Sequence, residues 1–157
     1  MLAQLPDSFP YRVLVLLHIL SAVVAFAPGF VWPVVNVRMR KGEGVPAPVR
    51  ALIPVLSATV YGPALVLNGL FGALAVVASP GSGDAKYVDF SKPWVSIALL
   101  LWFVMLGVLF GGLIPAERKE AQQAVTLATE SRVSMFGGML HLLFLLQLIN
   151  MIFQPGG

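Results

Sequence analysis

The sequence contains no cysteine, only two histidines and few charged residues. Asp, Glu, Lys and Arg make up 11% of its 157 residues, whereas soluble domains carry about 25%. The missing cysteines exclude disulfides and thiolate metal sites. Because so small a share of charge would leave a soluble domain prone to precipitation, the composition excludes an ordinary globular protein.

Apolar residues, by contrast, are abundant, and hydrophobic types account for 58% of the chain. Four apolar stretches reach the length of about 20 residues that a helix needs to cross a bilayer. They cover residues 11–36, 51–79, 94–114 and 133–153. Since these stretches use up most of the chain, we expect an all-α fold. It would be a four-transmembrane-helix bundle in the lipid bilayer, forming one domain over residues 1–157.

The basic residues are distributed unevenly among the short connections. Seven of the ten lie in the first and third connections, and three lie on the other side. The seven are Arg38, Arg40, Lys41, Arg50, Arg118, Lys119 and Arg132, and the three are Arg12, Lys86 and Lys92. This positive-inside pattern places both termini outside and predicts a multi-pass protein of the bacterial cytoplasmic (inner) membrane. The same pattern argues against a nucleic-acid partner, because the orientation of the chain in the membrane accounts for the net charge of +3.

Prolines interrupt the expected spans. Pro28 should kink the first, Pro54 and Pro63 fall within the second, and Pro115 should end the third. Such breaks are tolerated in membranes where neighbouring groups bond the freed carbonyls. The polar segment 116–132 is predicted to form a cytoplasmic helix that extends the fourth span.

The two histidines are the strongest functional signal in the chain. His18 lies in the first apolar stretch and His141 in the last. An ionisable residue within a span is by default a hypothesis for a functional site. Helical spacing places each histidine on a face with small residues, so both are expected to point toward other helices.

The second span adds a polar stripe formed by Ser57, Tyr61 and Asn68, which are separated by steps of four and seven residues. Asn68 is costly in hydrocarbon unless it is hydrogen-bonded. Helical rise places Asn68 near the depth of His18 and Tyr61 near that of His141. We therefore predict two polar layers, one at each depth.

The remaining spans carry weaker signals. Gly107 and Gly111 form a GxxxG pair, which is typical of a helix that packs closely on another. Gln147 and Asn150 lie away from the face of His141. Three roles stay open for these two amides: a bond to another helix, a place near the outer interface, or contact with a partner protein.

Two functional hypotheses follow from these residues. Two histidines on different spans can hold a b-type haem, although His18 and His141 differ in expected depth by about 8 Å. Other metal ions require more ligands than these two histidines provide. The spans contain no carboxylate of the kind that proton-coupled transport uses, and they contain no nucleophilic triad for hydrolysis. The leading hypothesis is therefore a non-catalytic accessory or small-ligand-binding subunit of a larger membrane complex or homo-oligomer. The alternative is a b-haem redox protein.

Two segments resemble known families. Residues 17–23 read LHILSAV and residues 148–156 read LINMIFQPG. Both resemble a bacterial family of predicted four-helix integral membrane proteins without an assigned function. The first segment is also similar to HemJ-like protoporphyrinogen oxidases and CopD-like copper proteins, in which Trp-hydrophobic-Gly follows the histidine. Residues 25–29 read AFAPG without the tryptophan, so this resemblance implies only His18 as a haem ligand.

Overall fold

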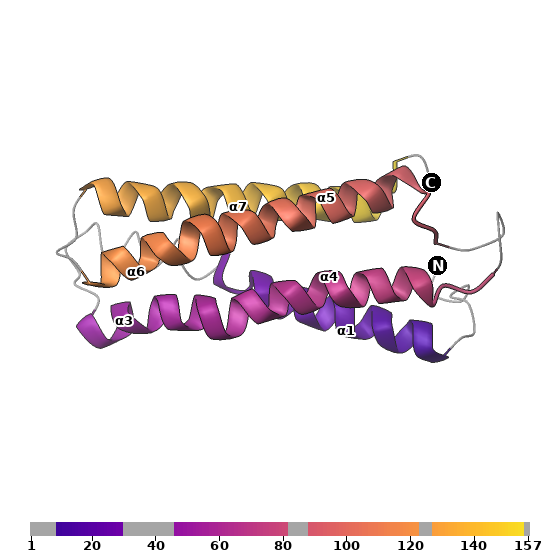
Figure 1. The fold of residues 1–157 in the computed structure, drawn as a ribbon, viewed down its shortest axis with the longest axis horizontal. Helices are drawn as coiled ribbons and strands as arrows, with labels where there is room; N and C mark the ends of the chain where they lie inside the picture. Colours follow the sequence, from indigo (N-terminus) through magenta and orange to yellow (C-terminus); the bar gives the residue numbers. More distant parts are fainter. Residues whose placement is uncertain (1–8, 30–45, 82–87, 123–126, 156–157) are drawn as a thin grey trace.

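The computed structural model describes residues 9–29, 46–81, 88–122 and 127–155, and within these ranges it contains helices and no strand (Figure 1). Four of the described helices are long and apolar enough to cross a membrane, which confirms the expected all-α architecture. The first is α1 (Phe9–Phe26), and the fourth is α7 (Leu127–Phe153). The second joins α3 (Ala47–Leu56), the π-helical turn η2 (Ser57–Tyr61) and α4 (Gly62–Val77). The third joins α5 (Pro93–Val108), the π-helical turn η4 (Leu109–Leu113) and α6 (Ile114–Gln122).

The helices form an antiparallel up-and-down bundle (Figure 1). Helix α1 packs mainly on α4, α5 packs on α7, and α3 packs on α6. The start of α1 and the end of α7 lie at the same end of the bundle, which we call the terminal end (Figure 1). The starts of α3 and α7 lie at the opposite end. Segments far apart in sequence therefore meet at each level of the bundle.

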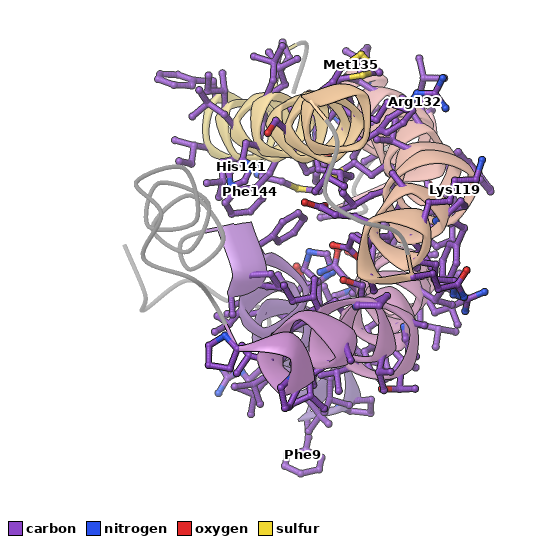
Figure 2. The ribbon with its side chains drawn as sticks, turned by 90° about the vertical axis from the view of Figure 1, so that its left-hand side faces the viewer. Phe9, Lys119, Arg132, Met135, His141 and Phe144 are labelled. Carbon is purple, nitrogen blue, oxygen red and sulfur yellow. The ribbon has the colours of Figure 1, made fainter. Side chains whose placement is uncertain are left out.

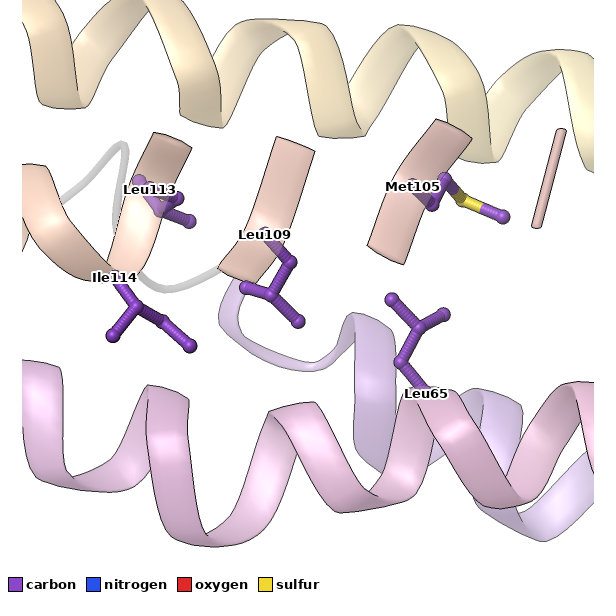
Figure 3. Packing of buried hydrophobic residues seen from close by; sticks show 5 residues of the cluster. All are labelled: Leu65, Met105, Leu109, Leu113 and Ile114. Carbon is purple, nitrogen blue, oxygen red and sulfur yellow. The ribbon is translucent and has the colours of Figure 1, made fainter. Parts of the chain in front are cut away.

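A small apolar cluster forms the centre of the bundle. It consists of Leu65, Met105, Leu109, Leu113 and Ile114, which join α4 to the third helix (Figure 3). Many other large apolar side chains point outward, including those of Leu100, Phe103 and Ile152. An apolar exterior around a small core is the distribution that suits a helix bundle surrounded by lipid.

Each π-helical turn ends two residues before a proline. In η2 the amide of Gly62 donates to the carbonyl of Ser57, and Pro63 follows. In η4 the amide of Ile114 donates to the carbonyl of Leu109, and Pro115 follows. Proline lacks a donor and its ring presses on the preceding turn, so a locally wider turn lets the helix continue.

The third helix does not end at Pro115 as predicted. Because η4 makes room for the proline ring, the helix continues through Pro115, which lies in the first turn of α6. Residues 116–122 therefore extend the third helix, not the fourth. The part of the polar segment from Leu127 onward belongs to α7, as predicted.

Helices approach closely where an aromatic ring covers a glycine. A Cβ atom added to Gly69 would lie 2.0 Å from the Trp102 ring, and one added to Gly112 would lie 2.6 Å from the Phe136 ring. Gly107 and Gly111 instead face open space, with nothing within 4 Å of an added Cβ. The expected packing of this GxxxG pair is therefore not found in the described bundle, because α5 packs through its larger side chains on another face.

Candidate functional site

His18 on α1 and Asn68 on α4 form a hydrogen-bonded pair between helices. The Nδ1 atom of His18 lies 2.7 Å from the backbone oxygen of Asn68, and Nδ2 of Asn68 donates to the backbone oxygen of His18 at 2.9 Å. This pairing confirms the predicted neighbourhood of the two residues. Nδ1 also lies 3.2 Å from Nδ2 of Asn68, but its contact with the carbonyl oxygen is shorter. Because a carbonyl oxygen only accepts, we assign the hydrogen to Nδ1, which leaves Nε2 of the neutral ring as an acceptor.

The His18–Asn68 pair forms part of the wall of a cavity of about 140 Å³ near the terminal end of the bundle. Side chains from α1, α4, α5 and α7 line this cavity, which we call the outer cavity. Its wall is mostly apolar and includes the aromatic rings of Tyr11, Trp94 and Trp102. Its lining residues, all of which lie in the described ranges, include no Asp, Glu, Lys or Arg.

Two amide side chains of α7 lie at or next to the outer cavity. Gln147 lines it, and the buried Oε1 of Gln147 has no hydrogen-bond partner. Asn150, only 6% exposed, donates from Nδ2 to the backbone oxygen of Trp94 at 2.8 Å. Of the three roles left open by the sequence, Asn150 therefore takes the bond to another helix. Its Oδ1, like Oε1 of Gln147, is a buried acceptor without a donor.

His141 lies elsewhere, on the surface of α7 that looks toward α1 (Figure 2). Its Nδ1 lies 2.6 Å from the backbone oxygen of Gly137, and its Nε2 contacts the backbone oxygen of Gly29. One turn further, the Phe144 ring stacks on that of Phe26 with centroids 3.7 Å apart. His141 reaches another helix as predicted, but its side chain stays largely exposed.

The predicted pairing of His141 with Tyr61 is not found. In the described part of the chain no hydrogen bond joins the two side chains, because the His141 ring is directed at Gly29 and Gly137. Tyr61 is half-buried in η2. The polar layer expected from these two residues is therefore absent from the described contacts.

The two histidines do not converge on one point. His18 contacts Asn68, whereas His141 contacts Gly29, which lies beyond the end of α1 at Phe26. One haem iron would need both imidazoles within bonding distance. Haem binding by His18 and His141 stays a prediction, which the absorption spectrum of the purified protein tests through its Soret band.

A second buried polar pair lies toward the opposite end of the bundle. Ser57 in η2 is hydrogen-bonded to Glu117 on α6, which is only 3% exposed. The Oε2 atom of Glu117 is buried and has no hydrogen-bond partner. The predicted stripe residue Ser57 thus meets a carboxylate, although no carboxylate was expected in the bundle.

Sequence reasoning missed Glu117 because it ended the third span at Pro115. A signal was present in the spacing. Leu109, Leu113 and Glu117 follow one another at steps of four residues, and all three are buried. This spacing places Glu117 on the same inward face as the two leucines.

No group of three or more His, Cys, Asp or Glu side chains that could hold a metal ion occurs in the described ranges. No family model, curated protein or solved structure matches the chain. The function therefore has to be argued from the outer cavity and its polar groups.

Proposed function

We propose that this chain is a multi-pass protein of the bacterial inner membrane, with both termini outside, that binds a small ligand in the outer cavity. It would hold this ligand as an accessory subunit of a membrane complex, without transforming it chemically. The observation that carries the proposal is the outer cavity itself. An apolar hollow with a few well-placed polar groups between helices is the usual form of a small-ligand site.

The chemistry of the lining supports binding over catalysis. His18 is its only imidazole, and the lining includes no carboxylate, serine, threonine or lysine with which His18 could share a proton-transfer or nucleophilic role. His18 is held by Asn68, whose main role is therefore to orient the ring. A ring fixed in this way can recognise a ligand through its second nitrogen.

The proposal is tested by filling the outer cavity. Ala98 lines it and is buried, so Ala98→Phe places a ring in the space that a ligand would use. The probe is 4-fluorotoluene, added to protein in lipid discs of phosphatidylcholine and phosphatidylglycerol. Its binding is followed by the 19F line width, with empty discs as the background for partition into lipid.

We expect the wild type to bind the probe and Ala98→Phe to bind it at least roughly tenfold more weakly. The matched control is Ala51→Phe, the same substitution at an exposed position of α3, which should bind as the wild type does. A wild-type protein that broadens the probe signal no more than empty discs would contradict the proposal.

A further inference from the structure

The outer cavity has unengaged acceptors on or just behind its wall, together with one unengaged donor group, the amide nitrogen of Gln147. Nε2 of His18 is a bare acceptor because Nδ1 donates to Asn68. Oε1 of Gln147 is buried without a partner on the cavity wall. Just behind the wall, Oδ1 of Asn150 is in the same state. A buried acceptor without a donor is rare in folded proteins and calls for an explanation.

Two donors on the same wall are already engaged. The indole N–H of Trp102 donates to the backbone oxygen of Leu65 at 2.8 Å. The amide of Asn68 donates to the backbone oxygen of His18 at 2.9 Å. The wall therefore offers a ligand two acceptors, Nε2 of His18 and Oε1 of Gln147, and the amide donor of Gln147. A hydroxyl group, which can donate one hydrogen bond and accept another, matches this set.

The size and lining of the cavity indicate a single ring. An apolar protein cavity of about 150 Å³ is known to hold benzene, and the outer cavity measures about 140 Å³. The rings of Tyr11, Trp94 and Trp102 lie in its wall. Aromatic side chains favour an aromatic partner through stacked or edge-to-face contacts.

Because the lining residues carry no charged side chain, the ligand is expected to be neutral. A bound cation or anion would be buried against apolar side chains without a countercharge, which is unfavourable. A neutral hydroxyl group can donate a hydrogen bond without bringing a charge. A protonated amine would bring one.

We infer that the ligand of the outer cavity is a neutral phenol-type molecule whose hydroxyl group donates to Nε2 of His18 or Oε1 of Gln147. The inference rests on the proposed small-ligand function and adds the chemical class of the ligand. Its apolar ring fills the space between the lining helices, and its hydroxyl group supplies the donor that Nε2 of His18 and Oε1 of Gln147 lack.

The experiment compares two probes that differ only in the donor. 4-Fluorophenol and 4-fluorotoluene have similar size and are measured in the same lipid discs by 19F line width, each corrected for its binding to empty discs. A net hydrogen bond corresponds to about a threefold to tenfold preference, so the wild type should bind 4-fluorophenol more tightly by that factor.

Three variants locate the preference. His18→Phe keeps a ring against Gly72 but removes Nε2, and should abolish the preference while changing 4-fluorotoluene affinity less than about twofold. Gln147→Met removes the other acceptor at nearly constant volume. Because Oε1 of Gln147 makes no hydrogen bond to another helix, Gln147→Met should leave the fold intact. It therefore tests the preference for 4-fluorophenol if His18→Phe fails to fold. His141→Phe is the matched control away from the cavity and should retain the preference.

The outcomes separate the two proposals. Loss of the preference in His18→Phe or Gln147→Met, with the preference kept in His141→Phe, supports the phenol class. Equal binding of both probes by the wild type, as an acyl-chain site would show, overturns the phenol class and leaves the small-ligand function standing. Binding of neither probe overturns both.

Discussion

Polar side chains inside this bundle are bonded mainly to backbone carbonyls of a neighbouring helix. Nδ1 of His18 donates to Asn68, the indole of Trp102 to Leu65, and the amide of Asn150 to Trp94. A helical carbonyl oxygen has a second lone pair, so it can accept such a bond while it keeps its own helix bond. The helices are therefore locked in register without any loss of backbone hydrogen bonds.

The His18–Asn68 pair should show measurable coupling in a double-mutant cycle of His18→Phe and Asn68→Leu. We expect the two substitutions together to cost less than the sum of the single costs, by about 1 kcal/mol in the free energy of unfolding. Unfolding in mixed detergent, followed by circular dichroism, measures the four free energies. Strict additivity would show that the pair contributes nothing beyond its packing.

Glu117 is a second residue whose energetics can be tested. Glu117→Gln keeps a group that can bond Ser57 but removes a buried carboxylate, whose second oxygen lacks a partner. We expect it to raise the free energy of unfolding by about 1 kcal/mol, because an amide costs less to bury than a charge.

Ser57→Ala is the contrasting change at the same site. It leaves the carboxylate of Glu117 buried without the Ser57 hydroxyl and should lower the free energy of unfolding by about 1–2 kcal/mol. Both variants are measured at pH 8 by the same detergent titration. A loss of stability in Glu117→Gln would indicate that the carboxylate itself has a partner role.

At the scale of whole elements, the apolar runs predicted the four helices well. The runs 51–79 and 94–114 correspond to continuous helices, and 133–153 lies within α7. The first run reaches residue 36, but α1 already ends at Phe26, and the part of the run beyond Gly29 lies outside the described residues. The length of an apolar run predicts a helix because a segment that spans the lipid must make its backbone hydrogen bonds internally.

The π-helical turns could not be predicted in the same way. A wider turn leaves no mark on average hydropathy, and Pro115 alone reads as a helix end. This error also affected the predicted polar residues, because the helix that continues through Pro115 carries Glu117, which was not predicted in the bundle. The pairing of His18 with Asn68 was predictable, because helical rise and the cost of a buried amide both pointed to it.

Other parts of the site depend on helix rotation, which the sequence constrains weakly. His141 was expected inside the bundle and proved exposed. Gln147 was expected on a face away from His141, but its place in the cavity wall beside His18 was not predicted. Small residues mark faces that permit close approach. They do not say which neighbour approaches, as Gly107 and Gly111 show.

The glycines give a test at this scale with internal controls. Gly69→Ala and Gly112→Ala would press a Cβ onto the rings of Trp102 and Phe136, and should lower stability by about 1–3 kcal/mol. Gly107→Ala and Gly111→Ala add a Cβ in open space and should be neutral or slightly stabilising, because alanine favours helix more than glycine. Melting of each variant in detergent provides the comparison. Equal losses at all four positions would contradict this account of the packing.

For the molecule as a whole, the two polar sites stand at different levels with an apolar layer between them. His18 and Asn68 lie toward the terminal end, and Ser57 and Glu117 toward the opposite end. The cluster that includes Leu65 and Leu109, drawn in Figure 3, lies between these pairs along the second and third helices. This order of layers suits a protein that holds a ligand on one side more than one that conducts a polar solute across.

The proposed orientation can be tested on the intact chain. Alkaline phosphatase fused after Gly157 should be active, because the positive-inside pattern places that end in the periplasm. The same reporter inserted after Gly44, in the first basic connection, should be inactive. Reversed activities would overturn the orientation, whereas two active or two inactive fusions would contradict an odd number of spans between the sites.

The π-helical turn η2 also bears on how this chain tolerates changes in length. A deletion inside a regular helix rotates everything beyond it by about 100°. A deletion of one residue within Ser57–Tyr61 would instead let the wide turn relax into an ordinary helical one, so the helix itself would survive. Asn68 would then keep its alignment with His18. The second helix therefore carries a surplus residue whose removal spares both the fold and the geometry of the outer cavity.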